Sequence, residues 1–345
     1  MTNQEERDLE RAQTPRSSGR DDFRRPPSLR NAEGALRTVG FELEFSGLSL
    51  DEVSSALRSA LGGEPQTLSV AEQQLEVEGL GRFKVELDWS YLKRKAAQAA
   101  EADSETDWVD LLSQAAAFLV PTEVVCPPIP ITELAVLHPM TKALRQAGAV
   151  GTEESLLAAY GVHINPEIPR LDAETLDAYL RAFALLQWWL VEAHEVDLTR
   201  KVSPYIDLYS EAYIVQLLSR ETPDLDQIFN DYLEHNASRN RSLDMLPLLA
   251  ELDAERVRGA VDDPKIGARP TFHYRLPNCQ IERPDWSLAA SWNRWCVVED
   301  LAHRPADLHA LGGEFLAAAS RPILGVSRSD WVERMETWLK DRGLV

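Results

Sequence analysis

Two glutamates, Glu42 and Glu44, alternate with apolar residues in the segment Gly-Phe-Glu-Leu-Glu-Phe at positions 40–45. Successive side chains of a strand point to opposite faces of a sheet, so both carboxylates are predicted to share one face. The apolar residues then share the other face and pack against a core. Carboxylate oxygens are hard ligands that suit Mg2+ or Mn2+, which makes the acidic face a candidate cation site.

Two more predicted strands add carboxylates in the same alternating pattern. Residues 83–89 place Glu86 and Asp88 on one face, together with a lysine, and apolar residues on the other. Residues 120–126 form a shorter apolar run that carries one acidic residue, Glu123. Several strands are therefore expected to contribute acidic side chains to one polar face of a single sheet.

Two later strands bring nitrogen donors to the same kind of face. In one, His163 and Asn165 share a face; in the other, His273 shares a face with Arg275. An imidazole nitrogen is a ligand that Mn2+ accepts, and the forked donors of arginine match the oxygens of phosphate or carboxylate. Taken alone, each histidine is more typical of a hydrogen-bonded structural residue, and that alternative stays open.

Three further arginines, Arg239, Arg241 and Arg269, offer the same forked donors. Arg239 and Arg241 belong to residues 236–241, which are too polar for a core, and they also fit as caps of neighbouring helices. Carboxylates and arginines on one surface are what a metal–nucleotide site requires, because cations bridge phosphates and arginines stabilise the transferred charge. The sequence has no Walker-type glycine loop, which excludes a P-loop site.

The elements that must position these residues are few strands among long helices. Apolar residues at helical spacing predict helices at 50–61, 107–118, 132–147, 172–194, 224–233, 243–252, 286–303 and 328–341. We therefore predict an α+β fold with an antiparallel or mixed sheet, whose polar active face is backed and flanked by helices.

Residues 1–35 are rich in charged residues, serine and proline without an apolar pattern, and we expect a disordered tail there. Residues 36–345 are expected to form a single catalytic domain. Its midsection, at about 172–260, and its C-terminal part are predicted to be helical.

Composition narrows the partners and the location. The net charge of −20 argues against a general nucleic-acid binder, because phosphate binding needs a basic surface. Three cysteines without close pairing suit a reducing compartment. The sequence contains no apolar run that could cross a bilayer and no secretory signal pattern. We expect a cytoplasmic protein without a membrane partner, and a homo-oligomer remains open.

The chain resembles the amidoligases, a branch of the carboxylate–amine ligase superfamily that includes glutamine synthetase and glutamate–cysteine ligase. The matching stretches, in chain order, are VGFELEF (39–45), GRFKVELD (81–88), EVVCPPIP (123–130), YGVHINPEIP (160–169), SRNRSLDMLPL (238–248) and ARPTFHYRLPNC (268–279). The resemblance covers roughly residues 36 to 305, which is nearly everything beyond the expected tail.

The resemblance implies a glutamine-synthetase-like catalytic sheet that binds ATP and two or more divalent ions, Mg2+ or Mn2+. It also implies amide bond formation in two steps. A substrate carboxylate attacks the γ-phosphate of ATP, and an amine then displaces phosphate from the acyl phosphate. The partners would be a small-molecule or peptide carboxylate and an amine, selected by loops at 93–106, 147–152 and 236–241.

Motif positions in the resemblance imply residue roles. The predicted metal ligands are Glu42, Glu44, Glu123 and His163. The predicted nucleotide contacts are Asn165, Arg239, Arg241 and His273. Arg275 matches an arginine that contacts phosphate, with help from Arg269. Glu86 and Asp88 would face the metal or the amine substrate.

One position departs from the family pattern. Glutamine synthetase has Glu-x-Arg in its last catalytic strand, whereas this chain has His273-Tyr274-Arg275. Either His273 replaces a glutamate ligand, or the number of ions differs.

Two other function classes stay open. A phosphotransferase like the guanidino kinases would use the same kind of sheet and make a phosphorylated product without an amine acceptor. A binding or regulatory protein would keep the fold without turnover. The complete set of acids, His163 and Arg275 argues against the second class.

Overall fold

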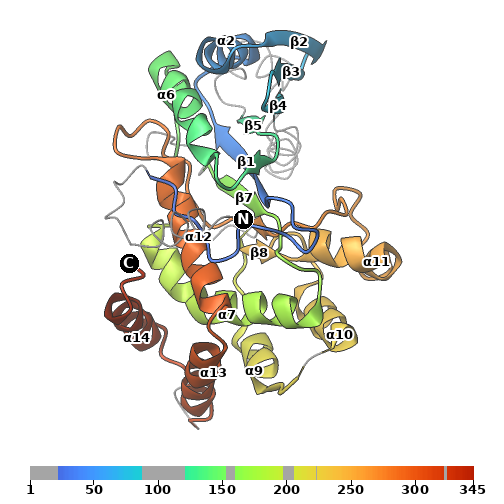
Figure 1. Ribbon diagram of the computed structural model, residues 1–345, viewed down its shortest axis with the longest axis vertical. Helices are drawn as coiled ribbons and strands as arrows, with labels where there is room; N and C mark the ends of the chain where they lie inside the picture. Colours follow the sequence, from blue (N-terminus) through green and yellow to red (C-terminus); the bar gives the residue numbers. More distant parts are fainter. Residues whose placement is uncertain (1–21, 88–120, 153–159, 197–205, 223, 322–324) are drawn as a thin grey trace, which may run out of the picture.

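The computed structural model describes residues 22–87, 121–152, 160–196, 206–222, 224–321 and 325–345. Within this part of the chain, nine strands form one sheet. In Figure 1 the sheet runs from the top of the molecule to its middle, and most of the helices lie below it. The predicted α+β class is confirmed.

All pairings between the named strands are antiparallel, in the order β2-β3-β4-β5-β1-β7-β9-β8, with β6 beside β1. The strands are β1 (Thr38–Phe45), β2 (Glu64–Ser69), β3 (Glu72–Val77), β4 (Gly81–Leu87), β5 (Thr122–Val125), β6 (Ile129–Pro130), β7 (Val162–Pro166), β8 (Leu243–Asp244) and β9 (His273–Tyr274). Because partners in an antiparallel ladder lie directly opposite each other, this register fixes which side chains meet.

Helices lie near both ends of the sheet (Figure 1). They are α2 (Leu50–Leu61), α6 (His138–Ala147), α7 (Ala173–Ala193), α9 (Glu211–Ser219), α10 (Leu225–Asn236), α11 (Leu246–Ala260), α12 (Leu288–Ala302), α13 (Pro305–Ala319) and α14 (Arg328–Asp341), with a short 3-10 turn at Leu134–Leu137. Helix α2 packs against α6 and against β3 and β4, whereas α7 packs against α12, α13 and α14. A capping box of Ser49 and Glu52 starts α2.

The alternation in β1 is realised as predicted. The apolar side chains of Val39, Phe41, Leu43 and Phe45 are fully buried, while the residues between them are half-buried on the opposite face. At the far end of the sheet, Tyr274 of β9 packs against Trp295 of α12, with ring centroids 5.2 Å apart. The apolar face is therefore one continuous core surface, and the polar side chains are left on the other side.

A buried ion pair fixes the entry to β1. Arg37 forms two hydrogen bonds with the Glu299 carboxylate of α12, at 2.7 and 2.8 Å, and both side chains are fully buried. Tyr179 of α7 donates a third hydrogen bond to Glu299 at 3.0 Å. The strand that carries Glu42 and Glu44 is thus tied to two helices by a buried network whose members all have partners.

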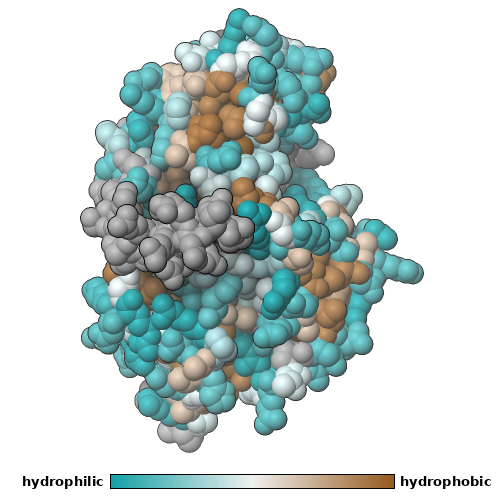
Figure 2. All heavy atoms as spheres, viewed as in Figure 1, coloured by the Kyte–Doolittle hydropathy of each residue, from teal (hydrophilic) through white to brown (hydrophobic). Residues whose placement is uncertain are grey.

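The surface is largely hydrophilic in the view of Figure 2. Among the described residues, the exposed large apolar side chains are Leu36, Leu68, Val70 and Val345. No helix in the described part of the chain is long and apolar enough to span a membrane.

Several predicted boundaries need correction. A disordered tail was expected at 1–35, but only residues 1–21 of that range lie outside the described part of the chain. From residue 22 the chain packs on the domain, where Arg24 forms an ion pair with Asp300 of α12 at 2.7 Å. The helix predicted for 243–252 begins as strand β8, the strand predicted for 271–276 is reduced to β9, and β2 and α13 were not predicted. The predicted helix at 107–118 and the loop at 93–106 lie outside the described residues.

Candidate active site

A row of glutamates crosses the polar face of the sheet. Glu44 of β1 lies opposite Glu123 of β5, which lies opposite Glu86 of β4, which in turn lies opposite Glu72 of β3. Directly opposed side chains have Cβ atoms about 5 Å apart, and like charges in such positions repel each other. A row of this kind is stabilised by a bound cation, and carboxylates are the ligands that Mg2+ and Mn2+ prefer.

A second row brings nitrogen donors next to the acids. Glu42 lies opposite His163 of β7, and its Oε2 is 2.9 Å from His163 Nδ1. Asn165 donates from Nδ2 to Glu42 Oε1 at 2.7 Å. Because Ile164 lies opposite Tyr274, the flanking residues of β7 and β9 continue this face toward His273 and Arg275.

Two groups of three potential metal ligands result, and they share His163. One contains Glu44, Glu123 and His163, and the other contains Glu42, His163 and His273; in each group the ligand atoms lie within 4.8 Å of one another. His163 Nε2 lies 3.9 Å from Glu44 Oε1, while the other oxygen of Glu44 accepts a hydrogen bond from the Gly161 amide at 2.9 Å. The donors fit a hard divalent ion that tolerates one nitrogen ligand.

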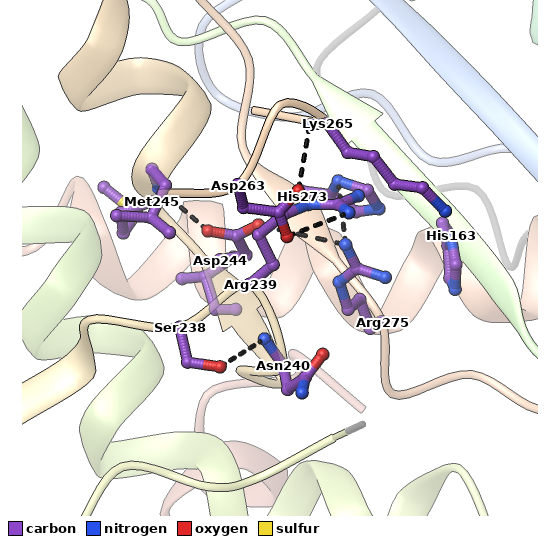
Figure 3. A network of polar contacts seen from close by, with 12 residues as sticks. His163, Ser238, Arg239, Asn240, Asp244, Met245, Asp263, Lys265, His273 and Arg275 are labelled. Carbon is purple, nitrogen blue, oxygen red and sulfur yellow. Dashed lines mark hydrogen bonds and ion pairs between the residues drawn. The ribbon is translucent and has the colours of Figure 1, made fainter. Parts of the chain in front are cut away.

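Arginines surround the opposite end of the site, around β8 and β9. Arg269 Nη2 and Arg275 Nη2 lie 3.3 and 3.4 Å from His273 Nδ1. Figure 3 shows Arg239, Asp244 and Arg275 gathered around His273. Arg239 is 3.6 Å from Asp263, and Arg275 is 3.8 Å from Asp244. This end of the face suits a phosphate or carboxylate group.

Burial and charge shift the pKa values of the central groups. Burial alone would raise the pKa of Glu42, but His273, His163 and Arg275 hold it well below its ordinary value. Burial, reinforced by Arg275, lowers the pKa of His273 well below its ordinary value. The Glu42 carboxylate is therefore ionised and the His273 ring is neutral near pH 7.

Two further carboxyl groups have raised pKa values. Burial raises the pKa of Asp244 to about 6, against the opposing effect of Arg275. Burial also raises the pKa of Glu86, with Glu72 and Glu42 adding repulsion and Lys84 opposing it. The acidic row thus has a member that resists ionisation when no cation is present.

Buried polar atoms without a hydrogen-bond partner concentrate at the arginine end. In the described part of the chain they include Asn165 Oδ1, Ser242 Oγ, Asp244 Oδ2, Arg269 Nε, Thr271 Oγ1 and His273 Nε2. An unsatisfied buried polar atom costs about 1–3 kcal/mol, so such atoms are rare without a purpose. Their concentration on and next to β7, β8 and β9 indicates that a polar ligand completes this end.

Most of the residues predicted from the sequence meet here. The structure brings together Glu42, Glu44, Glu86, Glu123, His163, Asn165, Arg239, Arg269, His273 and Arg275. Arg241 instead donates to the His235 carbonyl at 3.0 Å and lies 4.0 Å from Asp207. Asp88 lies outside the described residues.

Asp244 was not predicted as a site residue. It lies opposite His273 in the β8–β9 pair and is fully buried. The sequence predicted a helix at 243–252 that includes Asp244. A strand of two residues is too short to show the alternation that would have identified β8. A lone aspartate within the apolar run Leu243–Leu249 was the available signal.

Comparison with known proteins agrees with the resemblance. A family model described as "putative amidoligase enzyme" matches residues 35–297, which include every predicted site residue. The chain belongs to this amidoligase family. No curated protein and no solved structure matches the chain.

Proposed function

We propose that this amidoligase forms an amide bond between a carboxylate and an amine at the expense of ATP, through an acyl-phosphate intermediate. One observation supports the proposal most: a row of glutamates that suits a divalent cation borders an arginine cluster with unsatisfied buried polar atoms. An ATP–metal complex presents both complementary charges, cationic metal and anionic phosphate, to one enzyme face.

Glu44, Glu123 and His163 are the residues that would hold Mg2+ or Mn2+. Bound there, the ion would polarise phosphate oxygens and offset their charge. Both oxygens of Glu42 already contact His163 and Asn165, so this carboxylate also orients the neighbouring site residues.

In the first step, a carboxylate oxygen of the substrate attacks the γ-phosphorus and the bond to the β,γ-bridging oxygen breaks, which releases ADP. Forked donors stabilise negative charge on the transferred group, and Arg275 and Arg269, which both lie beside His273, would supply them. The Arg275 side chain is only 12% exposed, and this strengthens its contribution because electrostatic interactions are less screened away from water.

In the second step, the amine attacks the acyl carbon, the bond from that carbon to the phosphate oxygen breaks, and inorganic phosphate leaves. The amine nitrogen loses a proton as the amide forms. Glu86, which lies between Glu123 and Glu72 in the acidic row and has a raised pKa, is the described carboxylate best suited to accept that proton from the attacking neutral amine.

The test is product analysis with a panel of amino acids and short peptides as carboxylates and amines. An amidoligase releases ADP and inorganic phosphate only when both acceptors are present, and the amide appears in equal amount. A phosphotransferase releases ADP with a phosphorylated product and no inorganic phosphate. The absence of ADP under every condition, with protein shown to be folded, contradicts both.

A further inference from the structure

His163 and His273 lie next to each other, with ring centroids 5.0 Å apart, and both rings approach Glu42. Either could serve as a metal ligand by residue type. Their ring nitrogens, however, have opposite kinds of partner. Those partners determine which nitrogen carries the proton and which has a free electron pair.

His163 has a carboxylate at Nδ1. Glu42 Oε2 lies 2.9 Å away, and a carboxylate only accepts hydrogen bonds, so Nδ1 carries a proton. In the neutral ring the electron pair then lies on Nε2, which faces Glu44 at 3.9 Å and belongs to the same ligand group as Glu123. Metal-ligating histidines have this arrangement, with the second ring nitrogen held by a carboxylate.

His273 has guanidinium groups at Nδ1 instead. Arg269 Nη2 and Arg275 Nη2 lie 3.3 and 3.4 Å away, and a guanidinium group only donates. A proton on Nδ1 would point at two donors, so Nδ1 accepts and the proton of the neutral ring lies on Nε2. A protonated ring nitrogen has no electron pair for a metal ion.

The Nε2–H of His273 is a donor without an acceptor. The residue is only 4% exposed, and Nε2 has no hydrogen-bond partner. The closest carboxylate oxygen is Glu42 Oε2 at 3.8 Å, which is beyond hydrogen-bond distance and is already engaged by His163. In the described part of the chain, this donor is therefore left beside Glu42 without an acceptor.

We propose that His273 is a hydrogen-bond donor to an oxygen of the transferred phosphoryl group and does not ligate a metal. The proposal rests on the proposed function for its acceptor, and on the ring's own contacts for the tautomer. Two guanidinium groups at Nδ1 withdraw electron density and make Nε2–H a stronger donor. The group of Glu42, His163 and His273 is then no cation site, and Glu42 serves to orient His163.

The first test reads the tautomers directly. Protein labelled with 15N in its seven histidines is studied by long-range proton–nitrogen correlation NMR without metal, and His273→Gln and His163→Gln spectra assign the two rings. The expected result is a proton on Nε2 of His273 and on Nδ1 of His163. A proton on Nδ1 of His273 overturns the proposal.

The second test distinguishes a metal ligand from a hydrogen-bond donor by measuring the Mn2+ affinity of each variant. The signal of free Mn2+ in electron paramagnetic resonance reports the binding. We expect His163→Gln to weaken Mn2+ binding at least tenfold, and His273→Gln to change it by less than twofold. His309→Gln, on the exposed side of α13, is the matched control. A tenfold loss in His273→Gln overturns the proposal and leaves the proposed function intact.

The third test concerns the acceptor. Glutamine at position 273 keeps an N–H donor near the position of Nε2, whereas alanine removes it. With Mn2+ present, His273→Ala is expected to bind ATP about tenfold more weakly than His273→Gln. Equal ATP binding by the two variants overturns the proposal alone. Wild-type protein that binds Mn2+ but no ATP overturns the proposed function, and the assigned acceptor with it.

Discussion

The polar face of the sheet has two halves that are built in different ways. The acidic half lies on β1, β4 and β5, four to eight residues long, whose register fixes each glutamate opposite the next. The arginine half lies around β8 and β9, two residues each, and its side chains are held by contacts from segments far apart in sequence. Regular strands position the proposed cation ligands, and tertiary packing positions the proposed anion donors.

The two halves also differ in what they lack. Neighbouring carboxylates in the acidic half need positive charge, whereas the arginine half contains buried donors and acceptors without partners. A ligand with a cation at one end and phosphate oxygens at the other satisfies both. Changes on either side should therefore separate cation binding from phosphate binding. Four variants, two in each half, test the properties of the two halves.

The largest effect is expected for Glu44→Gln in the acidic half. Loss of a charged ligand should lower kcat by about a thousandfold or more, because the cation's charge stabilisation is lost with it. Phosphate release and Mn2+ binding are the measurements. Glu76→Gln, an exposed glutamate on β3, is the control and should retain both. Full activity in Glu44→Gln would show that the acidic row is ordinary surface.

A smaller loss, about a hundredfold in kcat, is expected for Arg275→Lys. Lysine keeps the charge but not the planar fork that fits two phosphate oxygens. The Mn2+ affinity of Arg275→Lys should stay unchanged, whereas that of His163→Gln should fall. Arg334→Lys, in an exposed pair with Glu314, is the control. Lost Mn2+ affinity in Arg275→Lys would break the division into two halves.

The third effect concerns pH and Asp244. Its pKa of about 6 lies above the ordinary value of 3.8, so the folded protein binds a proton that the unfolded chain does not. The charged form therefore costs stability above pH 6, and that cost disappears as the pH falls. Relative to Asp244→Asn, the wild type should gain about 1 kcal/mol of unfolding free energy between pH 8 and pH 5. Urea unfolding at both pH values measures it; parallel pH profiles would contradict the assignment.

The smallest effect is expected for Glu86→Gln. Because the pKa of Glu86 is raised, its charged form destabilises the fold at neutral pH, and this penalty fades as the pH falls. The variant should melt slightly above the wild type at pH 7 without metal, and the difference should shrink in acid and on addition of Mg2+. Glu64→Gln, on exposed β2, should show no such difference. If the difference in melting temperature between Glu86→Gln and wild type were the same with and without Mg2+, Glu86 would not belong to the cation site.

The same division explains what the sequence predicted. Glu42, Glu44 and Glu123 were placed on one face because the alternation of polar and apolar residues in their strands is a local signal. Asp244 was missed and assigned to a helix, since β8 and β9 are too short to show a period and pair across 29 positions of chain. The tautomer of His273 depends on Arg269 and Arg275 meeting at one nitrogen, which no spacing in the sequence specifies.

Arg241 shows the converse. Its residue type matched a phosphate contact, yet its guanidinium group holds the His235 carbonyl at the end of α10. The residue type predicted a contact with a ligand, whereas the observed contact of the side chain is a structural one with the backbone. The alternative of a helix cap, which the sequence left open, describes this contact.

A shared metal–nucleotide site is tested by the melting temperature of the protein with and without ATP, in the presence and absence of Mg2+. A ligand that binds only the folded state raises the melting temperature. We predict that ATP stabilises wild type and Glu76→Gln, requires Mg2+ to do so, and has no effect on Glu44→Gln. Equal stabilisation of Glu44→Gln and wild type, or stabilisation by ATP that ignores Mg2+, would contradict a shared metal–nucleotide site on this face.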